Sequence, residues 1–141
     1  MTLPHLGLIE KIPRFQHVED LEISVGCPIL SVCHDLEGKM YIRKWCTCAG
    51  PVDRWYFVPS NMNLITQYLA GTITMATLLW GVDGHGWLVD ITDGKLPKTG
   101  QYIQLDKLPP LYLPNKLLFH SQALRPKIVV PTTENDLKEI K

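Results

Sequence analysis

Two apolar runs around one short turn constrain the fold more than any other feature of this sequence. Residues 27–35, "CPILSVCHD", and residues 40–48, "MYIRKWCTC", flank the segment "LEGK". Runs of this length, rich in β-branched and apolar residues, predict β-strands. Gly38 can supply the positive φ of a two-residue hairpin loop at Glu37 and Gly38. We therefore expect an antiparallel hairpin in which residue 36 faces residue 39.

This turn predicts the pairing of the two strands and the face on which each side chain lies. Cys33 is expected opposite Ile42, and Cys27 opposite Cys48. Because side chains alternate between the faces of a sheet, Cys27, Cys33, Cys46 and Cys48 then share one face with Ile42.

The elements that follow predict an α+β fold. The pattern indicates a third strand over residues 54–59, helices over 61–70 and 75–80, and a later strand over 86–92. Ser60 and Thr74 can cap the helices, and a glycine follows each of them. The expected architecture is a mainly antiparallel sheet, a three-stranded meander plus the later strand, with two short helices packed on one side.

Chain length and proline placement predict a single domain. The chain has 141 residues, of which 45% are hydrophobic, enough for one core and too few for two ordinary domains. Residues 1–20 read as an irregular lead-in with a short edge strand near residues 6–9. Residues 21–120 form the predicted α+β domain, and residues 121–141 are interpreted as a flexible tail.

Overall charge argues against nucleic-acid binding through the bulk field. Fourteen acidic and fourteen basic residues cancel, and the pI is about 6.9. A local patch would be required, and one candidate combines basic residues with Tyr41, Trp45 and Trp55, which could stack on single-stranded bases. Its basic members are Lys39, Arg43, Lys44 and Arg54. The alternative is a charged strand face beside half-buried aromatic side chains.

The four cysteines could be a metal site or buried thiols. Structural zinc sites usually present paired C-x-x-C-like knuckles, whereas the spacing here is C-x5-C-x12-C-x-C. A C-x-C pair on a strand places both thiols on one face, and the predicted pairing of Cys27 with Cys48 permits half a metal site or a disulfide. Buried thiols are favoured, since free cysteine behaves as a small hydrophobe. No cofactor is expected, with zinc as the alternative.

Catalytic motifs give little support for an enzyme. The sequence "VDGHGWLVDITDG" offers Asp83, His85, Asp90 and Asp93 between glycines, which could provide Asp–His geometry. The same glycines suit a loop that leads into a strand. The sequence has no phosphate-binding glycine motif, no H-E-x-x-H and no G-x-S-x-G. A non-catalytic role is therefore favoured.

Residues 64–82 match the length of a membrane-spanning helix, but their chemistry does not. Gln67, Gly71 and several threonines interrupt the apolar run, and no cluster of positive charge flanks it. The first fifteen residues lack the pattern of a secretory signal. We expect a cytoplasmic protein, in which the thiols are reduced, and no membrane partner.

The absence of charge from residue 55 to residue 82 predicts a covered or partner-binding surface. Two helices packed on a sheet normally expose Glu and Lys, whereas the outward positions here are Asn, Gln and Thr. Depletion of charge with retained aromatic residues and methionine is typical of interface cores. The predicted partner-binding residues are Met62, Thr66, Tyr68, Met75, Thr77 and Trp80. Cover by the proline-rich C-terminal segment of the same chain is the alternative.

Four segments carry a resemblance to a known class of domains. The segments "EGKMYIRKW", "WYFVPSN", "LAGTITMATLL" and "LPPLYLP" resemble those of small bacterial domains of unknown function. The similarity spans roughly residues 25–115 and rests on packing motifs, so it implies a fold and no catalytic residue. The four cysteines, the neutral charge and "CTCAGPVD" in place of an acidic loop depart from that family.

These observations together predict a binding or regulatory module that contacts another protein chain, either a different protein or a second copy of itself. An accessory subunit or antitoxin-type inhibitor in a bacterial stress or defence system fits this expectation. The rival interpretation is a metal-binding or nucleic-acid-acting protein that uses the cysteines or the Asp83–His85 loop.

Overall fold

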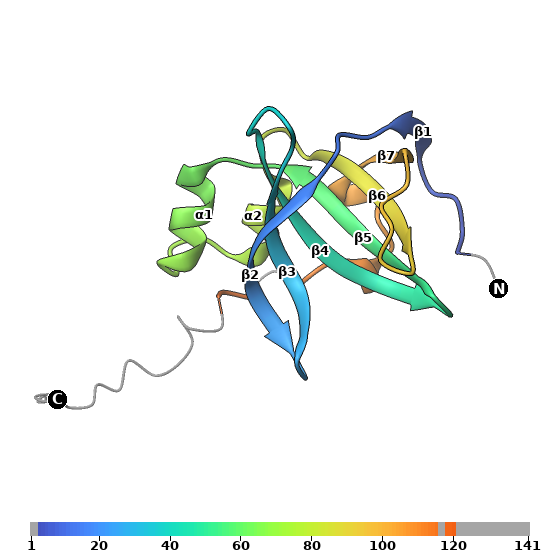
Figure 1. The fold of residues 1–141 in the computed structure, drawn as a ribbon. Helices are drawn as coiled ribbons and strands as arrows, with labels where there is room; N and C mark the ends of the chain where they lie inside the picture. Colours follow the sequence, from blue (N-terminus) through green and yellow to red (C-terminus); the bar gives the residue numbers. More distant parts are fainter. Residues whose placement is uncertain (1–2, 116–117, 121–141) are drawn as a thin grey trace, which may run out of the picture.

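The computed structural model describes residues 3–115 and 118–120, and its main feature is one seven-stranded antiparallel sheet (Figure 1). The strands are β1 Leu8–Lys11, β2 Gln16–Ser24, β3 Cys27–His34, β4 Met40–Ala49, β5 Val52–Pro59, β6 His85–Thr92 and β7 Thr99–Gln104. Helices α1 Met62–Leu69 and α2 Met75–Trp80 connect β5 to β6, and the 3-10 turns η1 Leu105–Lys107 and η2 Pro110–Tyr112 follow β7. The strand order is β1-β7-β6-β5-β4-β3-β2.

The predicted α+β class is wrong, because the fold is predominantly β. The meander, the later strand and the two helices on one side are present, and β1 overlaps the edge strand expected near residues 6–9, but the sheet also contains the unexpected strands β2 and β7. Strands β1 and β2 occupy much of the segment expected to be an irregular lead-in, and β7 follows β6. The predicted tail, residues 121–141, lies outside the described residues.

The predicted register of the β3–β4 hairpin is wrong by one residue. Val32 pairs with Ile42 and Cys33 pairs with Tyr41. The loop contains three residues rather than two, since the backbone N–H of Asp35 donates to the carbonyl of Lys39, and Gly38 has a φ of 83°. A three-residue loop ending in a left-handed glycine is a common hairpin connection. Because side chains alternate, this shift transfers Cys33 to the face opposite Ile42.

The short connection between the two edge strands requires the sheet to be strongly rolled. Strands β1 and β2 form opposite edges, yet only residues 12–15 join them. Five extended residue steps reach about 17 Å, whereas seven flat strands span about 29 Å from edge to edge. The two edges must therefore bend toward each other, and β2 crosses in front of the sheet in Figure 1.

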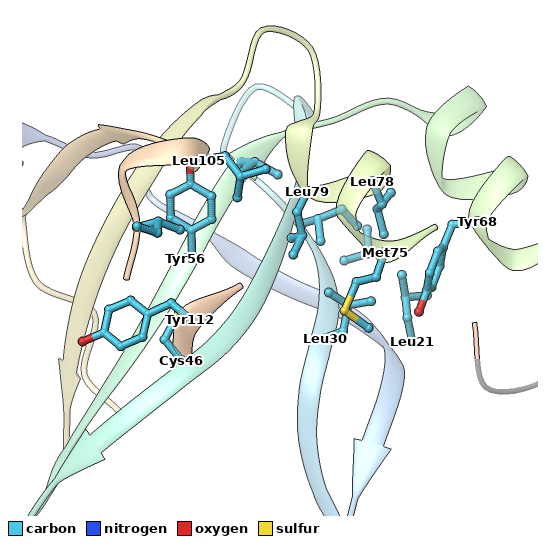
Figure 2. Packing of buried hydrophobic residues seen from close by; sticks show 14 of the residues in the cluster. Leu21, Leu30, Cys46, Tyr56, Tyr68, Met75, Leu78, Leu79, Leu105 and Tyr112 are labelled. Atoms are coloured by element: carbon cyan, nitrogen blue, oxygen red, sulfur yellow. The ribbon is translucent and has the colours of Figure 1, made fainter. Parts of the chain in front are cut away.

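One surface of the sheet, which we call the helix face, supports the larger core. It carries Leu30, Ile42, Tyr56 and Leu88 from four neighbouring strands. Residues from both helices and both 3-10 turns pack onto these side chains, as Figure 2 shows for Tyr68, Met75, Leu78, Leu79, Leu105 and Tyr112. The helices and the segment after β7 thus seal this face along most of its length.

The opposite surface, which we call the aromatic face, has a smaller core and a thinner cover. Its buried members include Cys33, Tyr41, Phe57 and Val89. Phe15, from the connection between β1 and β2, stacks on Phe57 with 4.2 Å between ring centroids. The cover of this face thus consists of the β1–β2 connection together with Leu96 from the β6–β7 connection.

The helix ends explain why the predicted helices form where they do. The side chain of Thr74 accepts a hydrogen bond from the backbone N–H of Thr77, so the predicted cap of α2 is confirmed. Helix α1 is capped by Asn61 rather than by Ser60. The Asn61 side chain accepts a hydrogen bond from the backbone N–H of Leu64 at 2.9 Å. Gly71 and Gly81 follow the two helices as expected.

Candidate protein-binding surface

The outer sides of the two helices expose apolar side chains within a segment, residues 55–82, that has no charged residue. Met62, Thr66 and Leu69 follow one another at helical spacing on the exposed stripe of α1, and Thr77 and Trp80 do so on α2. We call this set, together with Val82, the uncharged helical surface. The exposed fractions are 59% for Met62, 42% for Leu69, 49% for Trp80 and 61% for Val82.

Trp80 is held in a fixed position although half of it is exposed. A Cβ atom built on Gly84 would lie 2.7 Å from the Trp80 ring, so the indole rests directly on the Gly84 backbone. The N–H of Gly84 donates to the carbonyl of Trp80 at 2.8 Å, and the carbonyl of Gly84 accepts from the N–H of Leu105. Because both the N–H and the C=O of Gly84 are hydrogen-bonded, the backbone under the indole is fixed. The Trp80 side chain therefore loses little conformational freedom on binding.

Two of the six predicted partner-binding residues belong to the core instead. Tyr68 and Met75 are buried on the helix face, whereas Met62, Thr66, Thr77 and Trp80 are exposed. Tyr68 and Met75 were included because aromatic residues and methionine in an uncharged segment are typical of interface cores, and that criterion does not distinguish the inner from the outer side of a helix. The exposed apolar residues Leu69 and Val82 were missed, because their exposure depends on which stripe of α1 the sheet covers and on the path of the turn after α2.

Tyr68 anchors α1 through a buried polar contact. Its hydroxyl donates to the Glu22 carboxylate at 2.5 Å, and its ring stacks on His120 with 5.2 Å between ring centroids. His120 Nδ1 lies 3.2 Å from the same carboxylate. The pKa of Tyr68 is raised above its ordinary range, mainly by burial and to a lesser extent by the hydrogen bond to the Glu22 carboxylate. This network ties β2, α1 and the end of the described chain together.

The C-terminal segment covers part of the helical layer, as the sequence alternative expected, but not its outer stripes. Leu113 and Leu118 pack against the helix-face core, and the N–H of Met75 donates to the carbonyl of Leu118 at 2.7 Å. Met62 and Trp80 stay exposed in the part of the chain that the structure describes. A surface for a partner therefore remains beside the region that the chain covers itself.

The four cysteines do not converge. Cys33 is buried on the aromatic face and Cys46 on the helix face, while Cys27 and Cys48 are exposed, and all four are free thiols. Burial raises the pKa of Cys33 and of Cys46 to about 11 each, so both thiols stay neutral near pH 7. Within residues 3–115 and 118–120, no group of three His, Cys, Asp or Glu side chains is placed to hold a metal ion.

The basic residues considered for nucleic acid are distributed over different parts of the fold. Arg54 is fully buried and binds both carboxylate oxygens of Asp90, at 2.7 and 3.0 Å, and the carbonyl of Pro4 at 2.7 Å. Arg43 lies over Trp55 on the aromatic face. Lys44 points its ammonium at the carbonyl of Trp45, and burial lowers its pKa.

The fourth residue of that set, Lys39, is exposed at the β3–β4 turn. The four basic side chains therefore do not form one patch.

Of the acidic and histidine residues in and around β6, Asp83 and His85 lie together, whereas Asp90 and Asp93 lie elsewhere. The backbone N–H of His85 donates to Asp83 Oδ1 at 3.1 Å, and the His85 ring stacks on Tyr102. Asp90 is occupied by Arg54, and Asp93 lies beyond the other end of β6 in a turn with a φ of 53°. His85 and Asp90 are five positions apart on one strand, so alternation directs them to opposite faces.

Comparisons with known proteins add no functional assignment: no family model, no curated protein and no solved structure matches this chain. The resemblance to small bacterial domains therefore stays a prediction. No helix in the described part of the chain is long and apolar enough to cross a membrane.

Proposed function

We propose that this protein is a non-catalytic binding module that docks another protein on its uncharged helical surface. The observation that supports this most strongly is Trp80, half exposed and fixed on Gly84, within a segment that lacks charge from residue 55 to residue 82. Rigid exposed tryptophans are frequent hot spots of protein interfaces. The expected partner surface is apolar and uncharged, because a charge opposite Trp80 would be buried without a counterion.

The distribution of exposed apolar residues supports the same site. Met62 and Leu69 occupy one stripe of α1, and Trp80 and Val82 lie at the end of α2. Threonines 66 and 77 stand among them and add hydroxyl groups that can hydrogen-bond without a charge. Scattered apolar side chains are normal on protein surfaces, but four within 21 residues of uncharged chain are typical of a docking surface.

Site-directed photo-cross-linking in the native host tests the proposal. A benzophenone amino acid replaces Thr66 in one variant and Thr77 in another, and a third variant carries it at the exposed Glu37 of the β3–β4 turn. We expect Thr66 and Thr77 to yield the same discrete adduct with a second chain and Glu37 to yield none. No adduct from either helix position, or an equal adduct from Glu37, would contradict the proposal.

Introduced charge provides an independent test of the same surface. Thr66→Glu combined with Thr77→Glu places two carboxylates on the uncharged helical surface and should abolish the complex in co-purification. The matched control, Thr99→Glu with Gln104→Glu, adds the same charge at exposed positions of β7 and should leave the complex intact. Equal losses from both pairs would assign the effect to net charge rather than to this surface.

The proposed biological setting is one in which a binding module of this kind would be useful. An accessory subunit or antitoxin-type inhibitor in a bacterial stress or defence system would need a rigid scaffold with one uncharged docking surface and no catalytic residues. The four free thiols support a reducing, cytoplasmic setting. The partner caught by the cross-linker decides between a different protein and a second copy of the chain.

A further inference from the structure

The aromatic face contains a hollow that no side chain of the described protein fills. Its volume is about 480 Å³, which lies within the usual size range of small-molecule sites. Strands β3, β4 and β5 contribute Ile29, Trp45 and Trp55. The β2–β3 hairpin and β5 complete the lining with Ser24, Cys27, Pro28 and Asp53.

The hollow exists because the cover of the aromatic face is too short. Phe15 fills the half of this face that contains Phe57, Tyr41 and Trp87. The chain then enters β2 at Gln16, and nothing within the described residues crosses the other half, where Trp45 and Trp55 pair between β4 and β5. The second half of the aromatic face is therefore a preformed depression with an indole floor.

The only charged residue among those that line the hollow is Asp53. It lies two positions before Trp55 on β5, so both side chains project to the same side of the sheet. Trp45 Nε1 donates to Asp53 Oδ1 at 3.1 Å, and Oδ2 has no hydrogen-bond partner among the described residues. The Trp45 indole thus orients a carboxylate that retains a free acceptor.

The positive charge beside Trp55 belongs to Arg43, which does not itself line the hollow. The guanidinium carbon of Arg43 lies 4.1 Å from the centroid of the Trp55 ring. A hydrogen bond with His17 lowers the pKa of Asp20, and Ser31 and the charge of Arg43 contribute to that lowering. The charge of Arg43 thus also acts on Asp20, and among the residues that line the hollow the carboxylate of Asp53 is the one charged group, so it sets the sign of charge that the hollow attracts.

We propose that this hollow binds a small organic amine, an ammonium carried on an aromatic or similarly flat apolar body. The body would lie against Ile29 and the indoles of Trp45 and Trp55, and the ammonium would contact Oδ2 of Asp53. Indole faces attract cations, and a carboxylate beside them adds a charge-assisted hydrogen bond. The site is separate from the uncharged helical surface and does not depend on the function proposed for it.

The indole N–H signals of ¹⁵N-labelled protein test this site directly. The chain has four tryptophans, and single Trp→Phe variants assign their four signals. Phenethylamine, which is an ammonium at pH 7, is titrated in parallel with 3-phenylpropionate, an anion of similar size and shape. We expect saturable shifts at Trp45 and Trp55 with the amine, smaller effects at Trp80 and Trp87, and binding of the anion at least about tenfold weaker.

The Asp53→Asn variant separates charge from shape. Asparagine keeps an oxygen that can accept from Trp45 Nε1, so the indole stays oriented while the charge is removed. Phenethylamine should bind about tenfold more weakly to this variant, and Glu37→Gln, an exposed control, should bind it as the natural protein does. Equal affinity for the anion, unchanged affinity in Asp53→Asn, a response that does not saturate, or shifts concentrated at Trp80 or Trp87 would each overturn the proposal.

Discussion

Neighbouring residues of β3 show how differently the two faces of this sheet are used. Leu30 is fully buried under the helical layer, whereas Ile29 points to the other side and borders an open hollow. Two helices and two 3-10 turns cover the helix face, whereas residues 12–15 and Leu96 cover the aromatic face. The chain therefore concentrates its covering elements on one face and leaves exposed apolar side chains on both sides.

This difference determines which part of the molecule stays exposed on each side of the sheet. On the helix face the sheet itself is sealed, so the free surface is the outer side of α1 and α2, where Trp80 is exposed. On the aromatic face the cover ends at Phe15, so the free surface is the sheet itself, floored by Trp45 and Trp55. The first surface is suited to a protein and the second to a small molecule.

The largest expected effect comes from truncating the two neighbours on β3. Leu30→Ala should lower the free energy of unfolding by about 3 kcal/mol, because it leaves a cavity in a sealed core. Ile29→Ala should cost less than about 1 kcal/mol, because the removed atoms border solvent. Urea denaturation of both variants measures the difference. Similar losses would show that the aromatic face is as well sealed as the helix face.

Cysteine reactivity should divide the four thiols into two pairs. Iodoacetamide at pH 8 should modify the exposed Cys27 and Cys48 at least about a hundredfold faster than Cys33 and Cys46. Burial raises the pKa of the latter two to about 11, which keeps them as thiols, and their reaction requires local opening. Mass spectrometry of peptides during a time course gives the four rates. Rapid modification of Cys33 would mean that residues 12–15 do not cover the aromatic face.

Phe15→Ala should remove the cover of the aromatic face without unfolding the sheet. The ring is partly exposed and stacks on Phe57, so we expect a loss of about 2 kcal/mol, less than for a fully buried phenylalanine. Thermal unfolding measures the loss. The indole signal of Trp87, which also contacts Phe15, should move in the same variant, and an unchanged Trp87 signal would contradict the contact.

The smallest expected effect concerns the turn that sets the register of both faces. Burial opposes ionisation of Asp35, but hydrogen bonds from the N–H groups of Glu37 and Lys39 and from the Tyr41 hydroxyl outweigh it and lower its pKa below 3.8. A carboxyl group with a lowered pKa stabilises the fold above its ordinary pKa and loses that contribution as the pH falls through the folded value. Asp35→Asn should therefore be less stable than the natural protein at pH 7.

The two stabilities should approach each other as the pH falls below about 3.8. Urea midpoints of both proteins between pH 2.5 and 7 measure this convergence. A stability difference that is independent of pH would show that the Asp35 carboxylate does not stabilise the turn through its charge.

Local sequence signals predicted the middle of the fold well. Strands β3, β4, β5 and β6, the Thr74 cap and the glycines after both helices lie where pattern and capping chemistry place them. The register failed because a two-residue loop was assumed, whereas Asp35 accepts two backbone N–H groups and extends the loop to three residues. One residue of error was enough to exchange the faces of β3 relative to β4.

Long-range contacts explain what the sequence could not reveal. Strand β2 has three irregularities in its pairing with β3 and buries Glu22 against Tyr68, so its alternation is not visible in "QHVEDLEIS". Strand β7 places Gln101 in the interior, where its side-chain oxygen accepts from the N–H groups of Leu6 and Gly7. The uncharged segment was evident from the sequence. Identifying its exposed residues, however, required knowing which stripe of each helix packs on the sheet.

The most direct test of the two-face account compares Trp80→Ala with Trp45→Ala in the cross-linking experiment. Both variants remove an indole that borders solvent, one from the uncharged helical surface and one from the hollow. We predict that Trp80→Ala lowers the yield of the adduct from Thr77 at least about tenfold, and that Trp45→Ala leaves it unchanged. An unchanged yield in Trp80→Ala, or an equal loss in Trp45→Ala, would contradict the assignment of the protein partner to the helical surface.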